Sequence, residues 1–332
     1  MSDIKGIEFT DILGLSEPIT KLIEVLAGGC GKVYEPTHIN RIAKAKASEI
    51  RLISEAVNEN LNLPTHYSGG DVTIDTTSAQ ELIQRAGNRF LYQEMKKQQN
   101  IESIAAVAYK ELENEVQVSE EQVDSDWITR FFNSIEDISD NEMQEIWGRI
   151  LAGEIKQPNT YSLRTLDKLK NINKTEAFLF EELSKLVVES SSAYFIFDNN
   201  ETLNKQGLYF SQILDLEECG LISAQSLTLN LKISKDITKF ILNEELVGIF
   251  STQKEGELKI TISIYTLTKA GVQLYKVVKS STNAQYLIDN LKVYQRKSTD
   301  YNITAHRINF IDESGINYDD DTNLLADIEV TV

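Results

Sequence analysis

The sequence predicts an α+β fold that is predominantly α, with long N-terminal helices, a central helical domain and a C-terminal winged-helix-like module. Two periodicities support this prediction. Apolar residues recur at spacings of three and four through much of residues 1–190, as in helices, and alternate at every second position in two later stretches, as in strands. We place four successive regions at residues 1–118, 119–190, 191–300 and 301–332, with the first boundary in a strongly acidic stretch.

Composition and charge exclude several classes of protein. The chain has 332 residues, of which 41% are hydrophobic and 25% charged, as in soluble globular proteins. Its 33 basic and 51 acidic side chains give a formal net charge of −18, which argues against general nucleic-acid binding. No secretion signal and no transmembrane segment are expected. The two cysteines, Cys30 and Cys219, are far apart in the sequence, which predicts a cytoplasmic protein without disulfides.

Two long amphipathic helices are expected in the first region. One apolar stripe runs over residues 37–61, and a second runs from about Ser78 to Glu115 after a break rich in turn-forming residues. Both helices exceed the usual globular length of about 8 to 20 residues. A narrow apolar seam of this length is not covered by its own hairpin partner. We therefore expect the protein to form a homo-oligomer through residues 38–115.

Four shorter helices are expected between residues 119 and 190. A small polar residue followed three positions later by Glu or Gln marks three of their starts, at Ser119, Ser139 and Asn173. Within residues 142–153 the apolar side chains share one helical face, and Glu145 pairs with Arg149 on the other.

The period changes to two in the last third of the chain. Leucine and isoleucine alternate with polar residues over 227–233 and 258–264, which is typical of half-buried strands. A helix over 207–218 precedes these strands, and another helix begins at Thr268. This order predicts the winged-helix-like module, followed by a strand over 301–310 and a solvated acidic tail. Because residues 207–220 contain no Lys or Arg, we expect this module to bind another protein and not nucleic acid.

Three motifs suggest chemistry, but two lack a required residue and the third faces solvent. Residues 28–32 (Gly-Gly-Cys-Gly-Lys) lack the first glycine and the final Ser or Thr of a phosphate-binding loop. Residues 198–204 resemble a calcium loop, but Leu203 occupies the position that requires glycine. The triplet Glu257-Leu258-Lys259 matches a nuclease pattern, yet its charged side chains alternate outward from the predicted strand. The sequence therefore predicts no catalytic residue, no cofactor and no metal ligand, and we expect the protein not to be an enzyme.

The central region carries a recognisable signature. It comprises Trp127–Phe132, Met143–Glu154 and Ser162–Leu166, with Trp-Gly-Arg-Ile-Leu-Ala-Gly-Glu at residues 147–154. This signature resembles that of a bacterial family known only as a domain of unknown function. It resembles more weakly the abortive-infection alpha group of phage-defence proteins. The second resemblance implies a role in defence against phage.

The signature also contains the candidate site residues. We expect them to form an interaction patch for a partner or a small anionic signal: Trp127, Arg130, Trp147, Arg149, Glu154 and Arg164. The alternative is structural, with the tryptophans in the helical core and the arginines neutralising the 13 acidic side chains of residues 111–160.

These observations favour a non-enzymatic, self-associating interaction protein of the cytoplasm whose C-terminal module binds another protein. Two alternatives stay open. The protein could act on membranes through the amphipathic segment Leu15–Ala27, as a peripheral contact. It could also be a metal-dependent nuclease that uses Glu257 and Lys259.

Overall fold

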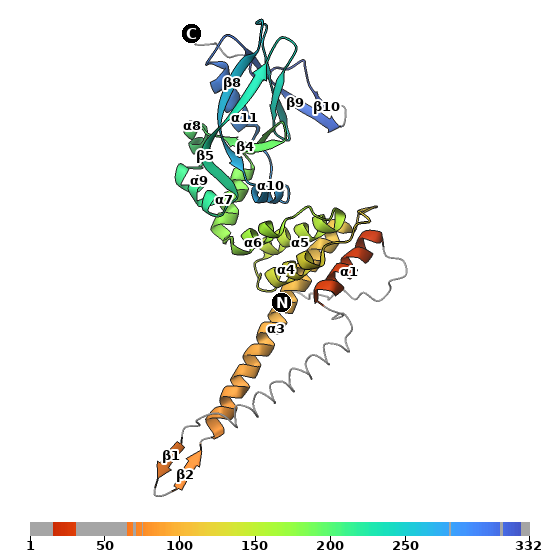
Figure 1. The fold of residues 1–332 in the computed structure, drawn as a ribbon, viewed down its shortest axis with the longest axis vertical. Helices are drawn as coiled ribbons and strands as arrows, with labels where there is room; N and C mark the ends of the chain where they lie inside the picture. The colour runs from red at the N-terminus through yellow and green to blue at the C-terminus, as the bar shows by residue number, and fades with distance from the viewer. Residues whose placement is uncertain are drawn as a thin grey trace. The chain divides into compact units, whose positions relative to one another are not determined.

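The computed structural model describes residues 16–30, 65–68, 71–74, 76–278, 280–312 and 315–326. The chain divides into two compact units, Met1–Leu166 and Asp167–Val332, which we call the N-terminal and C-terminal units and describe separately (Figure 1). The helix predicted over residues 37–61 lies outside the described residues, as does the end of the motif at 28–32. The three predicted boundaries between the four regions stay predictions.

The N-terminal unit is built mainly from helices. They are α1 (Glu17–Cys30), α3 (Thr76–Leu112), α4 (Ser125–Ile135) and α5 (Asn141–Lys156), accompanied by the antiparallel pair β1 (Thr65–Ser68) and β2 (Asp71–Ile74). The helix predicted over 78–115 is confirmed as α3. The C-terminal part of α3 is buried through Ile104, Ala108 and Leu112, and its N-terminal part continues beyond α1, α4 and α5 (Figure 1).

Aromatic rings and a glycine hold these helices together. The rings of Trp127 and Phe131 stack with centroids 4.9 Å apart, and Trp147 meets Phe131 edge-on at 5.5 Å. A Cβ atom on Gly148 of α5 would lie 2.5 Å from the Val107 side chain of α3. Only glycine therefore permits the observed approach of α5 to α3.

The C-terminal unit combines short helices with a sheet. Its helices are α7 (Lys174–Ser184), α8 (Asn200–Lys205), α9 (Phe210–Glu218), α10 (Lys269–Tyr275) and α11 (Ala284–Gln295). Its strands are β3 (Val188–Ser190), β4 (Ala193–Phe197), β5 (Ile222–Ile233), β6 (Lys239–Leu242), β7 (Leu246–Ser251), β8 (Leu258–Leu267), β9 (Asn302–Asp312) and β10 (Gly315–Tyr318). The remaining helix, α6 (Leu163–Asn171), begins in the N-terminal unit and ends in the C-terminal unit.

The eight strands form one antiparallel sheet in the order β10-β9-β7-β6-β3-β4-β8-β5. Helix α11 packs on β7 and β9. Its fully buried Tyr286 accepts a hydrogen bond from the backbone N–H of Phe197 at 3.0 Å, and its Leu291 lies against Gly248, where a Cβ atom would come within 2.6 Å. Side chains of α11 thus fix the helix to strands on both sides of the sheet's centre.

The prediction of a predominantly α protein with a winged-helix-like module is wrong. The eight-stranded sheet occupies the region where that module was expected. The two strands with alternating sequences are confirmed as parts of β5 and β8, which pair over most of their length. Strands β4 and β7 were not predicted because they carry apolar runs that are largely buried, and such runs show no period of two. Strands β3 and β6, of three and four residues, are too short to show a period at all.

The helix starts confirm one predicted cap and correct two others. A reciprocal capping box begins α7 at Asn173, as predicted. Helices α4 and α5 begin after Asp124 and Asp140, whose carboxylates accept hydrogen bonds from backbone N–H groups three residues on, at 2.8 and 3.3 Å. Aspartate caps as well as serine does, and its charge favours the helix N-terminus, so these residues replace Ser119 and Ser139.

Candidate functional sites

Three residues of the predicted interaction patch lie inside the N-terminal unit. Trp127, Trp147 and Glu154 are all buried. The indole N–H of Trp127 donates to the carbonyl of Tyr161 at 2.8 Å, and the backbone N–H of Tyr161 donates to Glu154, also at 2.8 Å. The structure therefore brings Trp127 and Glu154 together on either side of one loop residue.

Glu154 organises the loop that follows α5. Its carboxylate oxygens accept hydrogen bonds from the backbone N–H groups of Asn159 at 2.6 Å and Tyr161 at 2.8 Å. Asn159 itself adopts a left-handed backbone with φ of 69°, which asparagine tolerates better than most residues. Burial raises the pKa of the Glu154 carboxyl, although the backbone donors oppose the shift. Glu154 therefore has a structural role, because it holds the backbone of the loop in place.

The three arginines of the predicted patch lie nearer to solvent. Arg149 forms ion pairs with Glu111 at 3.6 Å and Glu145 at 3.2 Å. Arg130 and Arg164 are exposed, and neither forms an ion pair with a residue that the structure describes. The patch as a recognition surface for a partner stays a prediction.

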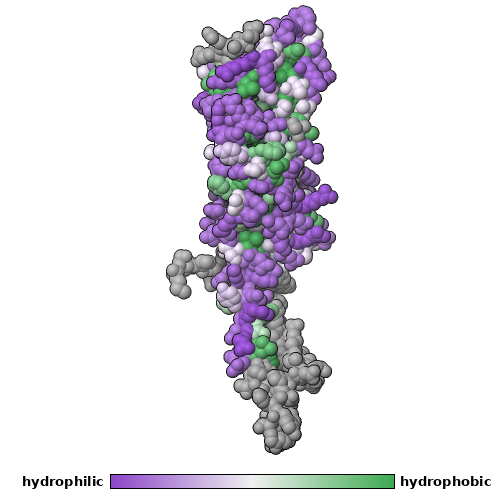
Figure 2. Space-filling view, turned by 90° about the vertical axis from the view of Figure 1, so that its left-hand side faces the viewer, coloured by the Kyte–Doolittle hydropathy of each residue, from purple (hydrophilic) through white to green (hydrophobic). Residues whose placement is uncertain are grey.

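A second candidate site is an exposed face of α3. Leu91, Tyr92 and Met95 are 55%, 70% and 66% exposed, although all three are large apolar or aromatic side chains. Figure 2 shows apolar side chains at the surface of this part of α3, among hydrophilic ones. The residues above and below them on the same face are uncharged and also exposed. We call the whole set the uncharged face of α3: Gln84, Asn88, Leu91, Tyr92, Met95 and Gln99.

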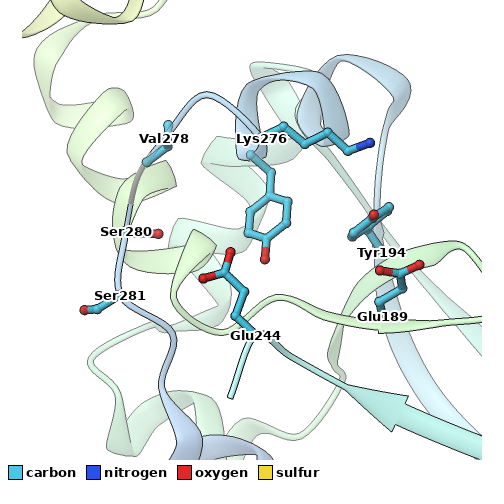
Figure 3. A pocket seen from close by; sticks show the side chains of 8 residues that line it. Glu189, Tyr194, Glu244, Lys276, Val278, Ser280 and Ser281 are labelled. Carbon is cyan, nitrogen blue, oxygen red and sulfur yellow. The ribbon is translucent and has the colours of Figure 1, made fainter. Parts of the chain in front are cut away.

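A third candidate is a cavity of about 520 Å³ in the C-terminal unit (Figure 3). Its polar lining consists of two glutamates, two tyrosines, a lysine and two serines. They are Glu189 of β3, Tyr194 of β4, Glu244 of the turn between β6 and β7, Tyr275 of α10, and Lys276, Ser280 and Ser281 after it.

The sheet register explains how these distant residues meet. Glu189 lies opposite Tyr194 in the β3–β4 pair and opposite Leu242 in the β3–β6 pair. The turn that carries Glu244 follows directly after Leu242, so it reaches the same end of the sheet. The tyrosine ring of α10 completes the wall, with the centroids of Tyr194 and Tyr275 5.8 Å apart.

Carboxylates dominate the electrostatics of the cavity. Burial and the nearby Glu244 carboxylate raise the pKa of Tyr275 to about 12. Burial and the Glu189 carboxylate, which accepts a hydrogen bond from the Tyr194 hydroxyl, raise the pKa of Tyr194. Both phenols are therefore neutral at physiological pH, and the formal charges of the two glutamates outweigh that of Lys276. The cavity can hold positive charge and cannot readily hold an anion.

Sequence reasoning missed this cavity. Its lining residues are separated by up to about ninety positions and follow no motif spacing, so only the strand order joins them. The buried aromatic run of β4 was the one signal available, because it predicts a strand when length and flanking turn residues are considered.

The stretch that resembles a calcium loop and the triplet that resembles a nuclease motif both have structural roles. Asn199 caps α8 within the stretch that resembles a calcium loop. Glu257 forms an ion pair with Lys232 at 2.9 Å, and both side chains are exposed. Among the residues that the structure describes, no group of three or more His, Cys, Asp or Glu side chains is placed to hold a metal ion. None of the described helices combines the length and apolar character that a bilayer crossing requires.

The comparisons with known proteins give one family. A family model described as "Protein of unknown function (DUF2806)" matches residues 84–292, which is more than half of the chain and includes the predicted signature. No curated protein and no solved structure matches the chain. The prediction of a family known only as a domain of unknown function is confirmed, and the protein belongs to the DUF2806 family.

Proposed function

We propose that the protein is a non-enzymatic interaction protein of the cytoplasm that associates with copies of itself through the uncharged face of α3. The observation that carries this proposal is the exposure of Leu91, Tyr92 and Met95, between 55% and 70%, on a single helix face. Exposed apolar residues that gather on one face are typical of interaction surfaces.

The geometry of α3 suits docking against another helix. Residues 84, 88, 91, 95 and 99 follow one another at spacings of three and four, so they form one continuous stripe along about four turns. No member of the stripe is charged, and a partner helix can therefore cover it without desolvating an ion. This stripe lies within the segment 38–115 for which the sequence predicts self-association.

Charge opposes contact between two copies of the chain less at this part of α3 than elsewhere. Two molecules with a formal net charge of −18 repel each other over most of their surfaces. The N-terminal part of α3, residues 76–99, is an exception, because its four basic residues outnumber its two acidic ones. Two copies thus meet with the least repulsion where the apolar side chains are exposed.

The test is the mass of the full chain in solution, measured by light scattering after size exclusion. We expect the wild type to exceed the 37.5 kDa of a single chain. Replacing Leu91 and Met95 by glutamate should return the mass to that of one chain, because two carboxylates would then have to be buried.

Leu82 provides the matched control. It is 58% exposed on the same helix but lies about two and a half turns from Leu91, on the opposite face. The Leu82→Glu variant should keep the wild-type mass. A wild type that stays a single chain at high concentration, or a Leu82→Glu variant that dissociates like the double variant, would contradict the proposal.

Two further parts of the sequence hypothesis stay untested. A role in phage defence is supported only by the weaker resemblance, and plaque counts on cells with and without the protein would test it.

The described structure favours neither of the two alternative functions, membrane action and metal-dependent nuclease activity. The apolar residues Ile19, Leu22, Val25 and Leu26 of α1 are buried, which leaves little apolar surface on this helix for lipid.

A further inference from the structure

We propose that the cavity at the β3, β4 and α10 end of the sheet binds a linear aliphatic diamine. Its two ammonium groups would pair with Glu189 and Glu244, and its alkyl chain would lie along the rings of Tyr194 and Tyr275. This site belongs to the C-terminal unit and is independent of the self-association proposed for α3.

The two carboxylates of the cavity come from separate elements. Glu189 comes from β3 and Glu244 from the turn after β6, and Figure 3 shows Glu189 beside Tyr194 and Glu244 apart from both. Beyond the effect of burial, the Glu244 carboxylate lies close enough to Tyr275 to raise the pKa of its hydroxyl. Two separate anionic poles suit a ligand with two separate positive charges.

An aromatic ring of this cavity already holds a cation. The Lys276 ammonium lies 5.6 Å from the centroid of the Tyr194 ring, within the range of cation–π attraction. Lys276 is exposed, and Figure 3 shows its side chain extending away from Glu244. A ligand ammonium can therefore reach Glu244 freely, whereas at the Tyr194 ring the ligand competes with Lys276.

The cavity suits a divalent metal ion less well than an organic dication. A divalent metal ion prefers several oxygen ligands converging on one point, and no three acidic or metal-binding side chains are so placed among the described residues. The space of about 520 Å³ also exceeds what a bare ion needs and falls in the range of small-molecule pockets. The hydroxyl of Ser280, which points toward the side of Glu244 in Figure 3, can accept a further hydrogen bond from an ammonium group.

The experiment is a calorimetric titration of the full chain with putrescine at about 0.15 M NaCl, which screens the general attraction of a diamine to an acidic protein. We expect saturable binding at one site. Glu189→Gln should raise Kd by about tenfold, because it removes an ion pair at a half-buried carboxylate. Glu244→Gln should raise Kd by about threefold, because the Glu244 side chain is exposed and its ion pair is weakened by water. Glu245→Gln removes the same charge one residue away and outside the cavity lining, so its Kd should equal that of the wild type.

A variant that should strengthen binding tests the same site if the glutamate variants fold poorly. Lys276→Gln removes the competing cation, so it should lower Kd by about threefold. Butylamine, with one ammonium, and butanediol, with none, should bind at least tenfold more weakly than putrescine. Absence of putrescine binding, equal binding by butylamine, or an equal loss in the Glu245→Gln variant would overturn the proposal, and none of these results bears on the α3 interface.

Discussion

The role of Glu154 depends on the residues that surround it in the fold and not only on its neighbours in sequence. Glu154 lies in the family signature and was expected on an interaction patch, yet it is only 1% exposed and binds the backbone of its own loop. The capping box at Asn173 could be predicted because it depends only on neighbours in sequence. The burial of Glu154 could not, because it depends on how the loop folds back onto α5.

The first residue-scale prediction concerns the stability of that loop. In a Glu154→Gln variant the side-chain amide would face one of the two backbone N–H donors that the carboxylate now satisfies. We expect a loss of about 1–3 kcal/mol in the free energy of unfolding, measured by urea denaturation. Glu145→Gln, at an exposed position on the same helix, is the control and should change stability by less than about 0.5 kcal/mol.

The second residue-scale prediction concerns pH. Burial raises the pKa of Glu154 above its ordinary value of 4.5, so the folded chain keeps this proton to a higher pH than the unfolded chain. Unfolding in this window releases the proton, and stability falls as the pH rises through the folded pKa. The advantage of the wild type over Glu154→Gln should therefore shrink between pH 4 and pH 7, in denaturation curves recorded at several pH values. An advantage that grows with pH would show that the pKa of Glu154 is lowered instead.

At the scale of elements, alternating strands and long amphipathic helices could be predicted, and short buried strands could not. The pair β3–β4 is an instructive case. Its turn residues Ser191 and Ser192 both have positive φ, 49° and 66°, which is the geometry of a tight hairpin turn. Asn-Gly or Asp-Gly usually indicates such a turn, and two serines give no comparable signal.

Helix packing supports an element-scale prediction with opposite outcomes for two glycines. Gly148→Ala places a methyl group 2.5 Å from Val107 and should cost about 1–3 kcal/mol by separating α5 from α3. Gly87→Ala lies in α3 with no atom within 4 Å of the new methyl group, so it should stabilise the helix by up to about 1 kcal/mol. Thermal unfolding of both variants checks the pair. Equal shifts in Tm would contradict the close contact between the two helices.

For the molecule as a whole, the 51 acidic and 33 basic side chains give a large negative net charge, which affects every interaction that it makes. The sequence establishes this charge without any structure. It does not establish the strand order of the sheet, because most of the strand pairings join segments far apart in the chain. The cavity depends on that order, so its composition could not be predicted either.

Charge leads to a whole-molecule prediction that separates the two proposed interactions. Raising NaCl from about 0.02 to about 0.3 M screens the repulsion between copies, so self-association through the uncharged face of α3 should strengthen. Putrescine binding depends on ion pairs and should weaken over the same range. Sedimentation and calorimetry at each salt concentration give the two trends. A parallel change in both would mean that one kind of force governs them.

The order of strands also has a consequence during synthesis on the ribosome. Strand β7 pairs with β9, which ends at Asp312, so the sheet cannot close until nearly the whole C-terminal unit has been translated. The N-terminal unit ends at Leu166 and is free to fold first. At about 5–20 residues per second, the nascent sheet keeps unpaired strand edges for several seconds or more. The newly made chain is therefore most exposed to aggregation in this interval, when chaperones would be most needed.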